Sequence, residues 1–168
     1  MVKKIEYPKK KWQKKVKKME GIFPSAFLNF LESKKSIFEV EVSEEIHVLA
    51  DDTNELLLLE IGMDTRIRIP SIQMLRMFSN EDLMPKIWTD AGATRFILNG
   101  ADLMRPGITK VDSFLENEFV QVVNPQGNVL AIHKAKFSSE EIMKKTKGKV
   151  TSVTTYLNDE IWNLPTQL

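Results

Sequence analysis

The 168-residue sequence predicts an α+β protein, in which a small α+β domain precedes a small, closed or partly closed β-barrel. Three observations predict this class. Short runs with strand periodicity recur along the chain, few helix-length patterns separate them, and turns containing Gly or Pro divide them. We place the two domains at residues 21–84 and 85–163, with a basic arm at 1–20 and a tail at 164–168.

The overall composition is that of an ordinary globular protein, with 42% hydrophobic and 28% charged residues. Cysteine is absent, which excludes disulfides, thiolate metal sites and cysteine nucleophiles. The longest apolar run, residues 56–59, is far too short to cross a bilayer, and no apolar secretory core follows the charged N-terminus. We therefore expect a cytoplasmic protein without a membrane partner.

Charge is distributed unevenly along the chain. Residues 1–20 carry nine lysines and two glutamates, so this arm holds +7 of a net charge of +1 and the remainder holds −6. Such an imbalance is typical of nucleic-acid contact. Trp12, Val16 and Met19 repeat at helical spacing, which predicts an amphipathic helix laid on the body. The lysines are then solvated, or contact phosphates non-specifically, or both; the candidates are Lys9, Lys10, Lys11, Lys14, Lys15, Lys17 and Lys18.

The first domain opens after Gly21 and Pro24, where Ser25 predicts a helix N-cap and the apolar residues that follow predict a buried helical face. Alternating and continuous apolar runs then predict strands, and Pro70 predicts the start of a second helix. The expected elements are strand 38–42, a hairpin of strands 46–50 and 55–61 around the turn 51–54, strand 66–69, and a helix with Ile72, Leu75 and Phe78 on its apolar side.

The second domain follows the same logic. Ser138 with Glu141 resembles a capping box, and the Val- and Thr-rich run at the end predicts a closing strand. The expected elements are strand 87–89, a helix 92–98 capped by Asp90, a Gly/Pro segment at 99–108, a hairpin of strands 119–123 and 129–132 around the loop 124–128, a helix through Lys145, and strand 149–156.

The Gly/Pro segment, residues 99–108, is the part of the sequence that indicates most about function. It places two glycines and a proline within ten positions. Glycine allows positive φ or close approach of another group, and proline fixes φ and removes a donor. A segment of this composition is shaped for its backbone path more than for filling a core. Such a path can present N–H groups to a ligand.

Three stretches, residues 86–93, 99–108 and 138–142, together resemble the PUA domain, the RNA-binding module named after pseudouridine synthases and archaeosine transglycosylases. The most specific part is Gly-Ala-Asp-Leu-Met-Arg-Pro-Gly, which is similar to the family pattern Gly-Ala-(Asp/Asn)-(Val/Ile)-Met-x-Pro-Gly. The resemblance covers residues 85–163 and implies that the second domain is a PUA-type pseudobarrel with short helices.

The end of the chain narrows the resemblance. Lys147-Gly148 and residues 155–162 are similar to the ending of the malignant-T-cell-amplified-sequence family and its archaeal relatives, which place a small α+β domain before a PUA domain. This resemblance implies an RNA-binding protein of the translation apparatus that acts in initiation or recycling. The partners it implies are tRNA acceptor ends or ribosomal RNA, the small ribosomal subunit, and a density-regulated-protein-like partner. The basic arm has no clear counterpart in that family.

RNA recognition on a small barrel needs cations for phosphates and backbone that lets the RNA approach closely. If the barrel closes, we expect the Gly/Pro segment and the last strand to form two sides of one groove. The glycines could instead form plain turns, the strand lysines could be merely solvated, and Met104 could belong to the core. The candidate RNA-binding residues are Arg95, Asn99, Gly100, Ala101, Met104, Arg105, Pro106, Gly107, Lys134, Lys136, Lys147 and Lys149.

Signatures of enzymes are missing from the sequence: there is no P-loop, dinucleotide fingerprint, nucleophile elbow or zinc-protease motif. We interpret Asp90 as a helix cap, Asp102 as a turn residue, and His47 and His133 as structural, because no third ligand stands at metal spacing. We expect no catalytic residue, metal or cofactor. Two other functions stay open: an RNA-binding subunit that presents substrate to a separate RNA-modification enzyme, and a ribosome-biogenesis factor similar to the Nip-type proteins.

Overall fold

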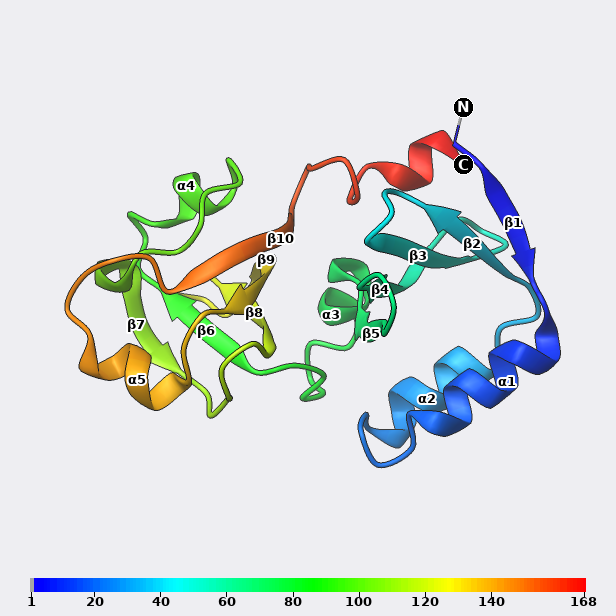
Figure 1. Cartoon of the computed structure of the whole chain (residues 1–168), viewed down its shortest axis with the longest axis horizontal. Coiled ribbons are helices and arrows are strands. Elements are labelled where there is room, and N and C mark those ends of the chain that lie inside the picture. Colours follow the sequence, from blue (N-terminus) through cyan, green and yellow to red (C-terminus); the bar gives the residue numbers. More distant parts are fainter. Residues whose placement is uncertain (1) are drawn as a thin grey trace. The chain divides into compact units, whose positions relative to one another are not determined.

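Two five-stranded sheets organise the chain in the computed structural model, which describes residues 2–168 (Figure 1). Each sheet belongs to a separate unit. One unit comprises residues 2–83 together with 163–168, and the other comprises Met84–Trp162. The division after Leu83 lies beside the predicted boundary, whereas the basic arm and the tail are parts of the first unit. None of the described helices has the length and apolar character needed to cross a bilayer.

The sheet of the first unit is an antiparallel meander in the order β1-β2-β3-β4-β5. Four of its strands lie within one residue of the predicted ones, because their apolar periodicity is strong. The strand β1 was not predicted, since its two apolar residues lie inside the lysine-rich arm. The strands are β1 Lys4–Tyr7, β2 Ile37–Glu41, β3 Ile46–Asp51, β4 Leu56–Ile61 and β5 Ile67–Pro70.

Helices of the first unit start one residue away from the predicted caps. Pro24, not Ser25, is the N-cap of α2. Pro70 ends β5 instead of opening a helix, because an edge strand tolerates a residue without an N–H. The N-cap of α3 is Ser71, whose hydroxyl accepts from Met74 N–H at 3.1 Å. The helices are α1 Lys9–Lys18, α2 Ser25–Glu32, α3 Ile72–Met77 and the 3-10 turn η2 Leu164–Gln167.

The basic arm is built into this unit. Its strand β1 pairs with β2, and α1 buries Trp12 and Val16 as the helical spacing predicted. The indole of Trp12 donates to the Leu31 carbonyl at 2.9 Å, which ties α1 to α2. Lys15 is buried too, and its ammonium lies 2.7 Å from the carboxylate of Glu60. The charge of Lys15 is therefore already paired inside the unit, which disfavours the predicted phosphate contact of this lysine.

The sheet of the second unit has the order β10-β9-β8-β6-β7, in which β6 and β8 are parallel and the other pairs antiparallel. The strand β7 was not predicted, because it begins inside the Gly/Pro segment. The elements are β6 Lys86–Thr89, α4 Thr94–Ile97, the 3-10 turn η1 Arg105–Gly107, β7 Ile108–Val111, β8 Phe119–Val123, β9 Val129–Ala135, α5 Ser139–Lys144 and β10 Thr151–Tyr156.

The core of the second unit lies between its sheet and its short helices. Ile87, Val120 and Val122 come from the central strands, and Ile97 and Ile142 come from α4 and α5. All five are almost completely buried. Burial of this apolar surface fixes α4 and α5 against the sheet. It thereby fixes the start of the Gly/Pro segment, which follows α4, and the start of the stretch that leads from α5 into β10.

The paired charge on α1 gives a stability prediction. Lys15→Ala leaves the buried Glu60 with Arg68, whose Nε donates to it at 3.0 Å, as its remaining cation. We expect a loss of about 3 kcal/mol in the free energy of unfolding, because a buried carboxylate loses one of its partners. Lys14→Ala, at the exposed neighbouring position, should change it by less than about 0.5 kcal/mol. Denaturant titration measures both, and equal effects would show that the ion pair contributes nothing.

Candidate nucleic-acid interface

The Gly/Pro segment lines an open hollow of about 470 Å³ in the second unit. Ala101, Met104, Pro106 and Gly107 of the segment line it, together with Phe96 of α4. The lining is mostly apolar, yet Phe96 is 53% exposed and Met104 is 49% exposed. Large apolar side chains left open around a concave surface mark a place where a ligand or partner binds.

The two glycines of the segment are required by contacts inside the protein. Gly100 has φ of +83°, and a Cβ there would lie 2.8 Å from the ring of Tyr156. A Cβ on Gly107 would lie 3.2 Å from the Cβ of Ala93. Close packing therefore explains both residues, and Gly107 in addition contributes to the hollow. Asn99 is exposed immediately before Gly100.

Arg105 anchors the segment. Its Nε donates to the Ile142 carbonyl at 2.8 Å, and its Nη1 donates to the Ile108 carbonyl at 3.3 Å. The first bond ties the segment to α5, and the second ties it to the start of β7. The guanidinium, which was predicted to contact phosphate, thus donates two of its five N–H groups to main-chain carbonyls. Arg95, by contrast, is exposed on α4, with its guanidinium 4.7 Å from the ring of Phe96.

The two aspartates that line the hollow, Asp90 and Asp102, both bond within the protein. The Asp90 carboxylate accepts from Ala93 N–H at 2.9 Å and caps the turn before α4. The Asp102 carboxylate accepts from Val153 N–H at 2.7 Å and lies 2.9 Å from the Lys149 ammonium. Burial alone would raise the pKa of Asp102, but the Val153 N–H and the Lys149 ammonium outweigh it and hold that pKa below its ordinary value.

Backbone bonds join the Gly/Pro segment directly to the start of the last strand. Arg105 N–H donates to the Gly148 carbonyl at 2.8 Å, and Val150 N–H donates to the Leu103 carbonyl at 2.9 Å. The two segments are therefore hydrogen-bonded neighbours, and the groove predicted between them stays a prediction. Lys147 and Lys149, which flank Gly148, are placed beside the hollow by these bonds.

Two lysines that the sequence analysis did not select extend this cationic edge. Lys144 ends α5, and Lys145 follows it with its ammonium 4.0 Å from the ring of Phe137. With Lys147 and Lys149 they form the cluster that we call the lysine edge, residues 144–149. Four lysines within six positions could have indicated this cluster from the sequence. Lysine is common at helix C-termini, however, so the pattern by itself does not indicate a binding site. Lys136 adjoins this edge, since its N–H donates to the Val150 carbonyl at 2.9 Å.

The remaining predicted cation stands on β9. Lys134 is exposed, and its ammonium lies 5.9 Å from the ring of Phe119 on β8. In β9 it pairs with Phe119 on one side and with Ser152 of β10 on the other. Within residues 2–168 no hydrogen bond or ion pair connects Lys134 with the Gly/Pro segment, whereas backbone bonds place Lys136, Lys147 and Lys149 near it.

A buried histidine supports the segment from inside. His133 Nδ1 lies 2.7 Å from the hydroxyl of Thr151, and that hydroxyl accepts from Leu103 N–H at 3.2 Å. Burial lowers the pKa of His133 to about 4, against a smaller opposing effect of Asp102. His47, in the other unit, lies 2.9 Å from an Arg66 nitrogen and 3.2 Å from Glu39. Among residues 2–168 no group of side chains is arranged to hold a metal ion.

Comparison with known proteins identifies the second unit. The PUA domain family model matches residues 85–157, which confirms the resemblance to that domain. The yeast Saccharomyces cerevisiae protein "Translation machinery-associated protein 20" is 32% identical over 103 residues, which cover 56% of each chain. Human "Malignant T-cell-amplified sequence 2" is 31% identical over 102 residues, 58% of this chain and 55% of the relative. The matched region thus spans about half the length of these two relatives.

Two archaeal proteins are similar over nearly their whole length. An uncharacterised protein of Methanocaldococcus jannaschii is 28% identical over 167 residues, 96% of this chain and 97% of that protein. The crystal structure of a hypothetical protein from Pyrococcus horikoshii is 26% identical, covers 97% of this chain and 99% of that one, and superimposes with a TM-score of 0.78. The fold of the chain therefore recurs over nearly its full length in a solved structure.

The buried imidazole gives a prediction about pH. The pKa of His133 is lower in the folded chain than the ordinary 6.5, so its stabilising effect is complete above pH 6.5 and is lost as the pH falls toward 4. We expect the second unit to lose about 2 kcal/mol of stability between pH 7 and 4.5 through this group. Native-state hydrogen exchange of β9 amides measures this loss.

The matched variants are His133→Gln, which should flatten that pH dependence, and His47→Gln, which should leave it unchanged because His47 lies in the other unit. The same pH dependence in wild type and His133→Gln would contradict the assignment.

Proposed function

We propose, on the premise that residues 85–157 are a PUA domain and that the chain resembles the malignant-T-cell-amplified-sequence proteins, that it is a non-catalytic RNA-binding protein of the translation apparatus. The observation that carries this proposal is the direct bonding of the lysine edge to a segment that lines an open apolar hollow. Such a surface places a cationic site for phosphates beside an apolar site for nucleobases.

Each half of the surface fits one part of a ribonucleotide. Met104, Pro106 and Phe96 give the hollow apolar faces on which an unstacked base can rest. Lys145, Lys147 and Lys149 lie at or near the bonded edge, and ammonium groups contact phosphates and fix the register of the strand. Lys149 also meets Asp102, so its ammonium is positioned before RNA arrives.

Recognition of this kind suits an RNA end or a loop whose bases are unstacked, because bases inside a duplex cannot enter a hollow. We infer that the RNA is a tRNA acceptor end or an exposed part of ribosomal RNA, and that the chain works on the small ribosomal subunit during initiation or recycling. The similarity to a translation machinery-associated protein supports this choice. A density-regulated-protein-like partner belongs to the same proposal.

Crosslinking in cells, followed by sequencing of the attached RNA, tests the proposal most directly. We expect crosslinks to tRNA 3′ ends or to small-subunit ribosomal RNA, and co-sedimentation with mature small subunits. Co-sedimentation only with precursor particles would instead identify a ribosome-biogenesis factor.

A second candidate function is supported by one similarity. "Probable tRNA pseudouridine synthase B" of Pyrococcus furiosus is 30% identical over 80 residues, which cover 47% of this chain but only 24% of that enzyme. On this alternative the chain presents RNA to a separate modification enzyme. A stable complex with such an enzyme, and the loss of one modified nucleotide when the chain is deleted, would establish it.

The hollow gives a binding prediction. Met104→Glu places a carboxylate at the exposed rim of the hollow, where it repels phosphate and is poorly accommodated beside a base. We expect at least a ten-fold loss of affinity for a single-stranded oligoribonucleotide, about 1.4 kcal/mol. The measurement is fluorescence anisotropy on the full chain.

The matched control is Leu115→Glu, which introduces the same charge at an apolar residue that is 69% exposed in the same unit but does not line the hollow. Equal losses in the two variants would show that the hollow has no special role.

A further inference from the structure

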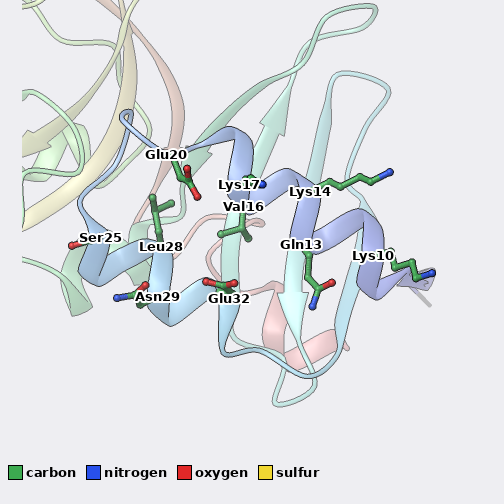
Figure 2. Close-up of a pocket in the computed structure, with 10 residues that line it drawn as sticks. All are labelled: Lys10, Gln13, Lys14, Val16, Lys17, Glu20, Ser25, Leu28, Asn29 and Glu32. Atoms are coloured by element: carbon green, nitrogen blue, oxygen red, sulfur yellow. The ribbon is translucent and has the colours of Figure 1, made fainter.

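We propose that the groove between α1 and α2 is a second RNA site, which binds the sugar–phosphate backbone of a single strand. This inference rests on the proposed function, and it assigns the site to the first unit. The groove has a volume of about 720 Å³, and its residues come from α1, from α2 and from the segment that joins them (Figure 2).

The α1 side of the groove is a row of cations. Lys10, Lys14 and Lys17 line it at positions i, i+4 and i+7, which lie on one face of a helix. With a rise of about 1.5 Å per residue the row is about 10 Å long, and a stacked strand advances about 3.4 Å per nucleotide. The length of the row therefore corresponds to about three nucleotide steps, so the three lysines can contact phosphates within a run of four.

The other side offers groups that hydrogen-bond to ribose and base. Ser25, Asn29 and Glu32 line it from α2, and the neighbouring α1 residue Gln13 also faces the groove. In Figure 2 the Lys10 and Lys14 side chains extend away from α2, whereas Glu32 lies between the helices. Phosphates would therefore lie along the outer rim, and the ribose hydroxyls, which can donate to a carboxylate, would lie inside.

The charged groups that line the groove are available to a ligand. In the described part of the chain, no hydrogen bond or ion pair engages the ammonium groups of Lys10, Lys14 and Lys17 or the carboxylate of Glu32. Lys15, which directly follows Lys14 in the sequence, is by contrast buried and paired with Glu60. The row is instead left open above an apolar floor of Val16 and Leu28.

Mixed charge argues for RNA as the occupant. Three lysines and two glutamates, Glu20 and Glu32, leave the lining with a net charge of +1. The side chains of a uniformly acidic peptide would be repelled by these two carboxylates. A ribonucleotide brings phosphates for the lysines and 2′-hydroxyl donors for the carboxylates, so it satisfies both kinds of group.

The test compares two triple variants of the full chain that remove the same charge. The groove triple is Lys10→Gln, Lys14→Gln and Lys17→Gln; the control triple is Lys3→Gln, Lys9→Gln and Lys18→Gln, three exposed residues outside the groove. Affinity for a single-stranded oligoribonucleotide is measured from 50 to 200 mM salt. We expect the slope of log K against log salt to flatten by about 2 in the groove triple, since each lost phosphate contact removes about 0.7, and by less than 1 in the control.

Equal slopes in the two triples would overturn the proposal, because they would show an effect of net charge alone. The hollow variant Met104→Glu, measured in parallel, separates the two sites. If that variant loses affinity while the groove triple keeps the wild-type slope, the groove proposal fails and the proposed function stands. If the wild-type chain binds no RNA in this assay or in cells, the proposed function is overturned, and the groove proposal is overturned with it.

Glu32→Gln tests the ribose contact separately. We expect it to reduce the preference for RNA over DNA of the same sequence by about five-fold, because an amide accepts the 2′-hydroxyl less strongly than a carboxylate does. An equal gain in affinity for both nucleic acids would overturn the ribose contact, since it would show that Glu32 only repels phosphate.

Discussion

The candidate interface depends on two backbone hydrogen bonds, from Arg105 N–H to the Gly148 carbonyl and from Val150 N–H to the Leu103 carbonyl. They bring a loop that is rich in glycine and proline beside a segment that is rich in lysine. The Arg105 guanidinium ties the Gly/Pro segment to α5, and the Asp102 carboxylate and the Thr151 hydroxyl each add a bond between that segment and β10. Without the ladder, the hollow and the cations would be unrelated.

Strong local periodicity made most of the fold predictable. The apolar runs of β3, β4 and β8 and the stripe of Trp12 and Val16 on α1 each identify their element without knowledge of a partner. The strands β1 and β7 could not be found in this way. Each has four residues, and each lies in a segment whose composition suggested something else, a charged arm in one case and a loop in the other. Pairing with a distant strand, not local preference, makes them strands.

Roles that depend on distant partners were the least predictable. Lys15 is one lysine among seven in α1, and only the position of Glu60 on β4 distinguishes it from its exposed neighbours. Arg105 stands in the motif that resembles the PUA domain, but its acceptors are main-chain carbonyls, which the identity of the residues does not reveal. The motif correctly indicated the PUA domain. Which of its side chains meet RNA stays a prediction.

The residues that pair with the Gly/Pro segment lie more than 40 positions later in the sequence. Arg105 is bonded to Gly148, and Leu103 is bonded to Val150. A nascent polypeptide emerges from its N-terminus, so the loop leaves the ribosome well before the residues that shape it. Until those later residues emerge, Leu103 and Arg105 lack the backbone partners to which they are hydrogen-bonded in the folded chain. The loop therefore takes its final path only after residues 148–150 have been made.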